Sequence, residues 1–333
     1  MGLMTPIATE AIASPNIALI KYWGNRDHEL RLPANDSLSM TLGGLETRVR
    51  MALDPALDAD RMVADSRPIT GEPLERVSRF LQIVRQLSGR REYASIETWS
   101  NFPQGVGIAS SAAAFAALAV AADAAYGLGL DRKSLSRLAR RGSGSAARSV
   151  FGGFVRLRSG QEDAAAFAEP ILGAGHWGLV DLIAIVSTSP KEVGSSKGHR
   201  LAETSPLQKA RVEDTPRRFD LCMHALLARD FQRLATIVQQ DSDLMHAVMM
   251  TSTPPLHYWE PATLAIMKTV LAWQAQGLQV AYTVDAGPNV HCLCPAAHAE
   301  EIQARLQAIP GVQTILCCHP GQEARLLIRP GAG

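Results

Sequence analysis

The most informative segment of the chain is Asn101-Phe102-Pro103-Gln104-Gly105-Val106-Gly107-Ile108-Ala109-Ser110-Ser111-Ala112. Its glycines precede two serines and a run, residues 110–128, that is nearly all Ala with Leu, Val and Phe. That composition predicts a central helix packed on most sides. Glycines let a backbone approach an anion closely, and the N–H groups and dipole of a helix start favour negative charge. We therefore expect a phosphate cradle, in which Ser110 and Ser111 add hydroxyl donors.

The same segment also has a simpler interpretation. Gly and Ser are common where a buried helix begins, so they could serve only as a cap. The pattern matches neither the Walker A loop nor the dinucleotide fingerprint, so the segment alone specifies no nucleotide. The choice between a cradle and a cap therefore depends on the rest of the chain.

Regular elements are predicted on both sides of this segment. Alternating polar and apolar residues at 37–42 and 46–51 predict half-buried strands, and apolar residues three and four apart predict an amphipathic helix over 73–87. Residues 179–187 form an apolar run, broken only by Asp181, that predicts a mostly buried strand. The order of elements in the second half suggests helices on one face of a sheet. Its predicted helices are 204–227, 231–250 and 261–276, and its predicted strands are 280–283, 290–293 and 313–318.

Length and charge bound the architecture and the partners. The chain has 333 residues, more than one core usually holds, so we expect two domains, residues 1–183 and 184–333, with a cleft between them. Its 33 Lys and Arg against 32 Asp and Glu create no overall field that favours nucleic acid or anionic lipid. The first residues show no leader pattern, and no uncharged run reaches membrane-spanning length. We therefore expect a cytoplasmic protein without a nucleic-acid or membrane partner.

Five cysteines fall late in the chain and raise the question of a metal site. Cys292 and Cys294 follow His291, and Cys317-Cys318-His319 lies further on, a spacing that invites a metal interpretation. The alternative is that Cys-x-Cys in an apolar strand places two small apolar side chains on one buried face. We expect the packing role and no metal held by these residues.

Five segments, in one order along the chain, resemble the mevalonate diphosphate decarboxylases of the GHMP kinase superfamily. The superfamily's ATP loop, Pro-x-x-x-Gly-Leu-x-Ser-Ser-Ala, is similar to residues 103–112, where Ile108 replaces Leu and keeps its volume. The other four segments are Asn16-Ile-Ala-Leu-Ile-Lys-Tyr-Trp-Gly24, Leu32-Pro-Ala-Asn-Asp-Ser-Leu-Ser39, Gly142-Ser-Gly-Ser-Ala-Ala-Arg148 and Val284-Asp-Ala-Gly-Pro-Asn289. Each is weak alone, but five at plausible spacings make chance agreement implausible.

The resemblance implies an α+β, two-lobed GHMP kinase fold, with a ribosomal-S5-like N-terminal lobe and a ferredoxin-like C-terminal lobe. ATP and substrate are expected to meet in the cleft, and the assembly is expected to be a homodimer. Mg²⁺ is expected to accompany ATP, and because the sequence shows no Asp/Glu cage, substrate phosphates are expected to provide ligands. The ATP contacts that the resemblance implies are Gly107, Ala109, Ser110 and Ser111.

Three charged residues carry the chemistry that the resemblance implies. Asp285 occupies the position of the family's catalytic base, where it would make the substrate's 3-hydroxyl a better nucleophile toward the γ-phosphate. Lys21 is expected beside Asp285, keeping it ionised, and Arg148 is expected to clamp the substrate carboxylate. Local sequence alone leaves ordinary alternatives open: an Asx-turn for Asp285, snorkelling from a strand end for Lys21, and a helix surface for Arg148.

One position departs from the family pattern and opens a question of substrate. The decarboxylases usually read Lys-Tyr-Trp-Gly-Lys, whereas the last position here is Asn25. That Lys is expected to help hold the substrate's diphosphate, so a 5-monophosphate substrate stays open unless the adjacent Arg26 compensates. Ser143 and Ser145 can form a small anion nest for the phosphate. The full set of expected substrate contacts is Asn16, Tyr22, Asn25, Ser143, Ser145 and Arg148.

These residues point to one reaction with named alternatives. We expect ATP-dependent decarboxylation of mevalonate 5-diphosphate to isopentenyl diphosphate through phosphorylation of the 3-hydroxyl, a step of isoprenoid precursor biosynthesis in the mevalonate pathway. One alternative is decarboxylation of mevalonate 5-phosphate to isopentenyl phosphate, and another is a mevalonate 3-kinase that stops after phosphoryl transfer. A binding module that senses ATP or a phosphorylated ligand without turnover is disfavoured by the full set of polar cleft residues.

Overall fold

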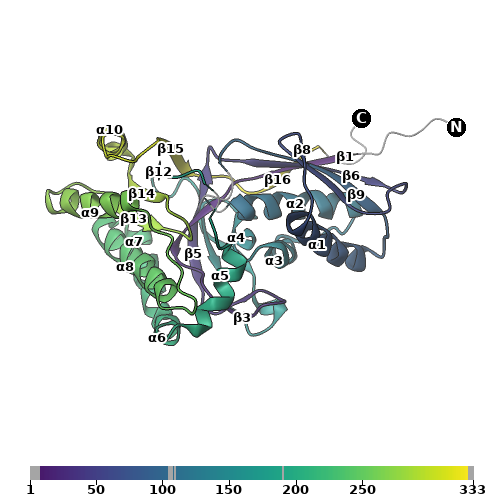
Figure 1. The fold of residues 1–333 in the computed structure, drawn as a ribbon, viewed down its shortest axis with the longest axis horizontal. Coiled ribbons are helices and arrows are strands. Elements are labelled where there is room, and N and C mark those ends of the chain that lie inside the picture. The colour runs from purple at the N-terminus through teal and green to yellow at the C-terminus, as the bar shows by residue number, and fades with distance from the viewer. Residues whose placement is uncertain (1–7, 104–107, 109, 190, 329–333) are drawn as a thin grey trace.

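The computed structural model describes residues 8–103, 108, 110–189 and 191–328, which form two lobes (Figure 1). The first lobe is built on a six-stranded sheet in the order β16-β1-β6-β9-β7-β8, antiparallel except for the β7–β9 pair. In β6 and β9 buried positions recur at every second residue, so one face of the sheet is covered. The strands are Ala8–Ala13 (β1), Thr47–Asp54 (β6), Arg61–Ala64 (β7), Arg67–Pro68 (β8), Tyr93–Ser100 (β9) and Arg325–Ile328 (β16).

The covered face packs against α2, the central helix that the sequence predicts. α2 spans Ser110–Tyr126, and its Ala-rich surface is buried on most sides, which confirms the prediction. α1 (Glu72–Ser88) confirms the amphipathic pattern, because its apolar residues are buried and Gly89, with φ of 71°, ends it. α3 (Arg132–Gly142) and α4 (Ala146–Ser149) complete this layer. This packing therefore holds the start of α2 beside the turn that connects α3 to α4.

A second sheet runs through both lobes. Its order is β11-β10-β5-β15-β12-β14-β13, and β2 pairs with β5 beside this path. β5 belongs to the first lobe and β15 to the second, and they join at Gly43 and His319. The expected domain boundary after residue 183 falls inside β12. After the second lobe the chain returns to the first sheet as β16, so the two lobes are joined through strands at both places where the chain passes between them. The strands are Asn16–Ile20 (β2), Ser37–Gly43 (β5), Phe154–Leu157 (β10), Ala168–Leu172 (β11), Leu179–Ile185 (β12), Ala281–Val284 (β13), Val290–Pro295 (β14) and Thr314–Pro320 (β15), with Asn25–Asp27 (β3) and Leu32–Pro33 (β4) as a separate pair.

Helices cover both faces of the second lobe's sheet, so the prediction of helices on one face is wrong. β12 is buried at every position: Ile183 packs toward α7 and α8, and Leu182 packs toward α9 and α10. A continuous apolar strand is typical of a sheet covered on both faces. The predicted helix over 204–227 is divided, since prolines cannot continue a helix ladder. The helices are Ser195–Leu201 (α5), Gln208–Glu213 (α6), Thr215–Ala228 (α7), Phe231–Met250 (α8), Pro261–Ala275 (α9) and Ala299–Gln307 (α10), with 3-10 turns at Asp163–Ala165, Ala202–Thr204 and Ala296–His298.

The cysteines belong to this core. Cys292 and Cys294 are fully buried on the face of β14 that packs against α9, which confirms the packing interpretation. Burial raises the pKa of the Cys294 thiol to about 12, so it stays protonated at neutral pH. All five cysteines fall within the described residues, and none of them is in a disulfide.

Candidate active site

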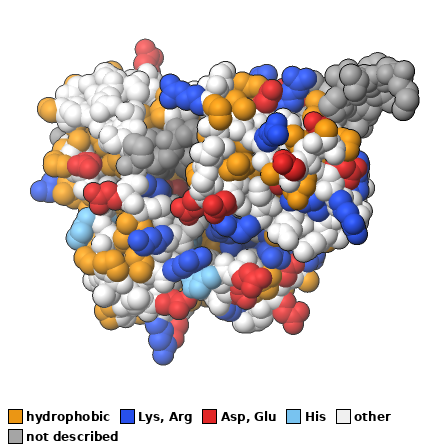
Figure 2. Space-filling model, turned by 45° about the vertical axis from the view of Figure 1, so that its right-hand side comes forward, with side chains coloured by type: hydrophobic (Ala, Val, Ile, Leu, Met, Phe, Trp, Pro, Cys, Tyr) orange, Lys and Arg blue, Asp and Glu red, His pale blue; other side chains and the backbone are white. Residues whose placement is uncertain are grey.

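A cavity of about 800 Å³ opens between the two lobes, and it is lined mainly by cations. Figure 2 shows Lys and Arg side chains gathered near the middle of this face. Among the described residues, nine Lys or Arg line the cavity against four Asp or Glu, although the whole chain carries a net charge of only +1. A cleft lined by one sign of charge focuses the field within it. The cavity is therefore suited to ligands with several negative charges.

Lys21 and Asp285 form an ion pair in this cavity. Lys21 directly follows β2 and Asp285 directly follows β13, so one strand end from each lobe delivers the pair. The Lys21 Nζ lies 2.6 Å from the Asp285 Oδ1, and the two side chains are 1% and 23% exposed. Burial opposes ionisation of Asp285, but the Lys21 ammonium, with His291 and Arg148 nearby, outweighs burial and holds the pKa of this carboxyl below its ordinary value. Asp285 is therefore an ionised carboxylate at neutral pH.

Arg148, on α4, is a second buried cation in the cavity wall. Its guanidinium donates to the Asn16 Oδ1 at 3.0 and 3.1 Å and to the Ser37 Oγ at 2.5 Å. No carboxylate within the described ranges pairs with it, and its side chain is 3% exposed. Burial lowers the pKa of Arg148 to about 10, so it still carries its charge at neutral pH. Neutral oxygens thus fix its orientation without cancelling its charge, which suits it to a ligand carboxylate.

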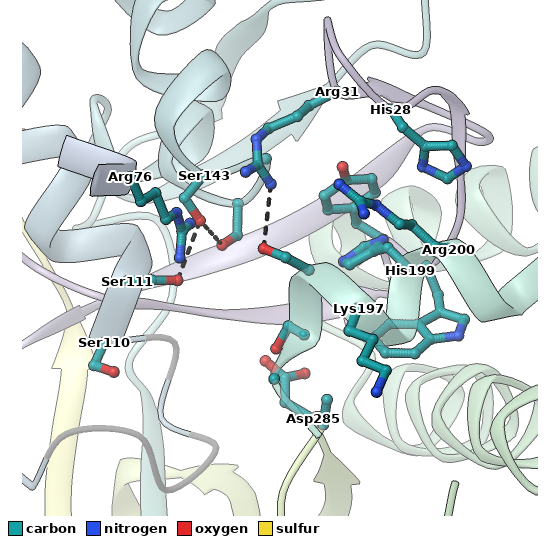
Figure 3. Close-up of a pocket in the computed structure, with 18 of the residues that line it drawn as sticks. His28, Arg31, Arg76, Ser110, Ser111, Ser143, Lys197, His199, Arg200 and Asp285 are labelled. Atoms are coloured by element: carbon teal, nitrogen blue, oxygen red, sulfur yellow. Dashed lines mark hydrogen bonds between the residues drawn. The ribbon is translucent and has the colours of Figure 1, made fainter. Parts of the chain in front are cut away.

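The start of α2 forms another part of the wall (Figure 3). The Ser111 Oγ lies 3.1 Å from the Ser143 Oγ, which in turn lies 3.4 Å from the Ser145 Oγ. A chain of hydroxyls therefore joins the helix start to the Gly-Ser-Gly-Ser turn, and Ser110 lines the cavity beside it. Such a helix start favours phosphate groups. Two of the expected ATP contacts lie outside the described residues: Gly107 and Ala109.

Two expected substrate contacts lie behind the cavity wall. Asn16 is 1% exposed, and its side chain holds Arg148 through the contacts given above. Asn25 is 6% exposed, and its Oδ1 accepts a hydrogen bond from the Tyr22 hydroxyl. Tyr22 itself lines the cavity, as Ser143 and Ser145 do. Asn16 and Asn25 are therefore placed to act on a ligand through Arg148 and Tyr22.

Arginines that the sequence patterns did not identify bring further charge to the cavity: Arg31, Arg76 and Arg200 (Figure 3). Arg76 donates twice to the carbonyl of Gly142, at 2.8 and 3.1 Å, and no carboxylate of the described chain pairs with it. Arg76 belongs to α1, and the sequence of the polar face of this helix is typical of an ordinary solvent-exposed surface. Arg26 instead donates to two backbone carbonyls in a separate cavity of about 330 Å³, so the compensation expected of it is not found.

Lys191 and His199 complete the wall contributed by the second lobe. The Lys191 Nζ donates to the carbonyl of Ala286 at 2.7 Å, and burial lowers its pKa to about 8. The His199 ring lies against those of Tyr22 and Trp23, with centroids 4.4 and 4.6 Å apart, and burial lowers its pKa to about 3. Lys191 also donates to the Ser195 Oγ, four positions away, but its partner Ala286 and the His199 partner Gly24 lie 95 and 175 positions away, so local sequence gives no signal that either side chain reaches the cavity.

The fold and the cavity together define a class of protein: a two-lobed α+β enzyme that brings a helix start suited to phosphate, an ionised carboxylate and an arginine without a carboxylate partner in the described chain to one site. Two family models match the chain, the diphosphomevalonate decarboxylase-like N-terminal domain over residues 13–168 and the mevalonate 5-diphosphate decarboxylase C-terminal domain over residues 181–324. The chain belongs to the diphosphomevalonate decarboxylase family. The family and the GHMP kinase fold inferred from the five segments are thus confirmed.

Individual relatives agree with this assignment. Diphosphomevalonate decarboxylases of Saccharomyces cerevisiae and Homo sapiens are each 36% identical to the chain, over 86% and 87% of it and 77% of each relative. The mevalonate diphosphate decarboxylase structure from Staphylococcus aureus matches with a TM-score of 0.92 at 32% identity, covering 97% of this chain and 98% of that one. A structure of MDDEF in complex with MVAPP, AMPPCP and magnesium matches with a TM-score of 0.92 at 34% identity, covering 97% and 100%.

Proposed function

We propose that this chain is an ATP-dependent decarboxylase that converts mevalonate 5-diphosphate into isopentenyl diphosphate. The observation that carries the proposal is the placement of three charged groups in one cavity: Asp285 with Lys21 at 2.6 Å, and Arg148 without a carboxylate partner in the described chain. The pair suits removal of a proton from an alcohol, and the lone guanidinium suits a substrate carboxylate. Relatives named diphosphomevalonate decarboxylase, and a related structure holding MVAPP and AMPPCP, support the substrate and ATP.

In the proposed reaction, Asp285 accepts the proton of the substrate's 3-hydroxyl as that oxygen attacks the γ-phosphate of ATP and ADP leaves. Lys21 keeps the carboxylate ionised and offsets the negative charge of the transferred group. The bond from C3 to the phosphorylated oxygen then breaks, and phosphate departs. The bond between C2 and the carboxylate breaks as well, and its electron pair forms the C2–C3 double bond as carbon dioxide leaves. Arg148 holds the carboxylate so that this bond stays aligned.

Magnesium fits this site as a companion of ATP. Within the described residues no group of three or more His, Cys, Asp or Glu could hold a metal ion, so a protein cage does not fit. The hydroxyls of Ser110 and Ser111, at the start of α2, are the neutral oxygen donors beside the expected phosphate position. When bound, Mg²⁺ supplies charge neutralisation on the ATP phosphates.

A second candidate function is decarboxylation of mevalonate 5-phosphate to isopentenyl phosphate. It is favoured by Asn25, which stands where the family usually carries Lys and whose neutral side chain is engaged with Tyr22. The excess of cations in the cavity, nine against four carboxylates, favours the more highly charged diphosphate. We therefore rank the diphosphate first. A mevalonate 3-kinase is disfavoured because its substrate carries no 5-phosphate to meet these cations.

We further propose that the protein works in the cytoplasm as a homodimer. Five unpaired thiols and a need for ATP support that compartment. No helix in the described part of the chain is long and apolar enough to cross a membrane. Exposed leucines on α7 and α9 support association between copies; they are Leu221, Leu227, Leu264 and Leu271. Sedimentation of the purified protein tests the dimer, and a monomer at assay concentration would contradict it.

One assay tests the catalytic proposal. Purified protein receives ATP and Mg²⁺ with mevalonate, its 5-phosphate or its 5-diphosphate in separate reactions, and ADP and carbon dioxide are both measured. Equal amounts of the two products, fastest with the diphosphate, are expected. Preference for the 5-phosphate would establish the second candidate, and ADP without carbon dioxide would indicate a kinase. Neither product with any substrate would contradict all three.

A further inference from the structure

Lys21 is held by its backbone as well as by its ammonium. It directly follows β2, and residues 21–24 belong to no helix or strand, so no sheet ladder satisfies its N–H and C=O groups. A buried backbone polar group without a partner costs free energy comparable to a lost hydrogen bond. Since Lys21 is 1% exposed, water cannot serve these groups freely. Side chains must therefore provide the partners.

Two charged side chains of the second lobe fill this role. The Lys21 N–H donates to the Asp241 Oδ2 at 2.6 Å, and the Lys21 carbonyl accepts from the Arg211 Nη2 at 2.8 Å and from the Asn35 Nδ2 at 3.0 Å. Asp241 lies on α8 and Arg211 on α6, and they are 0% and 3% exposed. Hydrogen bonds to ionised groups are roughly twice as strong as neutral ones. The backbone N–H and C=O of Lys21 are thus both hydrogen-bonded to buried charged side chains.

Arg218, on α7, joins the two gripping residues. Its Nε donates to the Asp241 Oδ1 at 2.7 Å, and its Nη2 donates to the Arg211 carbonyl at 2.9 Å. Its remaining nitrogen donates to Asp214 at 2.6 Å. Hydrogen bonds therefore link these charged residues into one network that reaches the cavity: Lys21, Arg211, Arg217, Arg218, Asp214, Asp241 and Asp285.

We propose that Asp241 and Arg211 are positioning residues that hold the main chain of Lys21 so that its ammonium stays against Asp285. This inference rests on the proposed function, because that function makes Asp285 the base. Neither positioning residue lines the cavity, so each acts on turnover through the main chain that it holds. Asp241 holds Lys21, and Arg211 holds Lys21 and, at 3.3 Å, the carbonyl of the next residue but one, Trp23. Loss of either grip lets Lys21 shift, and a misplacement of about 1 Å can cost about a hundredfold in rate.

The first test pairs Arg211→Met with Arg85→Met. Arg211→Met removes donors to the carbonyls of Lys21 and Trp23, which Asn35 and Gln208 still satisfy, so the fold is expected to survive. Arg85→Met makes the same change at an arginine of the first lobe that lies outside the cavity and donates to buried Asp60 at 2.9 Å. We expect Arg211→Met to lower kcat about ten- to a hundredfold, with both KM values within about twofold. Arg85→Met should leave kcat per folded molecule unchanged, with the folded fraction measured by urea denaturation.

The pH profile separates positioning from a general loss of stability. The Lys21 ammonium lowers the pKa of Asp285, so moving it away raises that pKa and moves the acidic limb of kcat to higher pH. Arg211→Lys keeps a charged donor and should restore the limb in part. Asp241→Asn, which removes the charge on the N–H side, should move it in the same direction as Arg211→Met. The other charged or titratable groups that face Asp285 are unaltered in these variants: Arg148, Lys191, His246 and His291.

Either of two kinetic results would overturn the proposal: a wild-type kcat and pH profile in Arg211→Met, or the same kinetic changes in Arg85→Met. NMR titration of ¹³C-labelled Asp carboxyls, with Asp285→Asn to assign the signal, reports the pKa of Asp285 without turnover. An unshifted titration in Arg211→Met would also overturn it. If the wild-type protein forms neither ADP nor carbon dioxide, the proposed function fails, whereas this titration still decides whether Arg211 positions Lys21.

Discussion

Lys21 and Arg148 are both buried cations of the first lobe in the wall of one cavity, yet their surroundings differ. Lys21 has a carboxylate partner, Asp285, at 2.6 Å. Arg148 has the neutral oxygens of Asn16 and Ser37 in the corresponding role. A buried charge without a counter-ion is costly, so its retention is explained when a ligand brings the counter-ion. The first cation therefore lowers the pKa of a carboxyl of the protein, and the second is available for the substrate carboxylate that we propose it binds.

Replacing Asp285 should have the largest effect, because it makes Lys21 a second unpaired cation and removes the proposed base. We expect Asp285→Asn to lower kcat roughly a hundred- to ten-thousandfold. ATP affinity, measured by calorimetry, should stay close to wild type, because the start of α2 is untouched. Asp243→Asn is a matched control, since Asp243 accepts from Tyr282 and lies outside the cavity lining. Retention of more than about a tenth of the wild-type rate would remove Asp285 from the role of base.

Changing Arg148 tests the other side of the comparison. Arg148→Lys keeps the charge but cannot reproduce two parallel contacts with a carboxylate, nor the fixed contacts to Asn16 and Ser37. We expect kcat/KM for the mevalonate substrate to fall about a hundredfold, while KM for ATP stays within about twofold. Arg156→Lys is the control, because Arg156 pairs with Asp36 away from this cavity. Unchanged kinetics in Arg148→Lys would mean that Arg148 is structural.

The contrast also shows which parts of the site sequence can reveal. Lys21, Arg148 and Asp285 each lie in a short segment that resembles a known family, so they could be named before the fold was known. Arg76 could not, because its helix face has the composition of any solvated surface. Asp241 carries a weak signal, since a charged residue occupies a buried position in the apolar pattern of α8. Its partner in the ion pair, Arg218, is 23 positions away, and only the packing of α7 on α8 brings them together.

Elements of the fold that are determined by nearby residues could be predicted from the sequence, and features that depend on distant residues could not. α8 spans the predicted residues 231–250, because one helix face carries the whole pattern. The helix expected over 204–227 is divided, since Pro206 and Pro216 interrupt a pattern that spacing alone does not exclude. The two-sided cover of β12 depends on contacts between distant segments, although its continuous apolar run was a usable signal. The pairing of β5 with β15, which joins the lobes, could not be predicted from the sequence of either strand.

Ser111 tests whether the comparison is confined to the substrate side of the cavity. Its hydroxyl lies at the start of α2, where a phosphate of ATP is expected. Hydrogen bonds to charged groups contribute about 1.5–3 kcal/mol, so Ser111→Ala should lower kcat/KM for ATP by roughly tenfold or more. KM for the mevalonate substrate should stay close to wild type. Ser145→Ala should show the reverse pattern, and an exchange of the two patterns would mean that the ligands are placed the wrong way round.

The smallest effect is expected at Asn25, where a third cation can be added near the first two. Asn25 is buried behind Tyr22 and accepts a hydrogen bond from the Tyr22 hydroxyl. Asn25→Lys therefore breaks that hydrogen bond and adds an ammonium. Asn25→Met is the matched control, because it breaks the same bond with a side chain of similar length and no charge. The ratio of the two variants therefore isolates the charge.

An ammonium at position 25 that extends past Tyr22 can contact the second phosphate of the 5-diphosphate, which the 5-monophosphate lacks. We expect Asn25→Lys, relative to Asn25→Met, to raise kcat/KM for the 5-diphosphate roughly two- to tenfold, the range for one net hydrogen bond of about 0.5–1.5 kcal/mol. The 5-monophosphate should respond less, and steady-state kinetics with both substrates measure the difference. An equal response for both would show that position 25 does not reach the phosphates. Asn25 would then no longer favour the monophosphate, and the cations that line the cavity would have to set the preference, Arg31 and Arg76 among them.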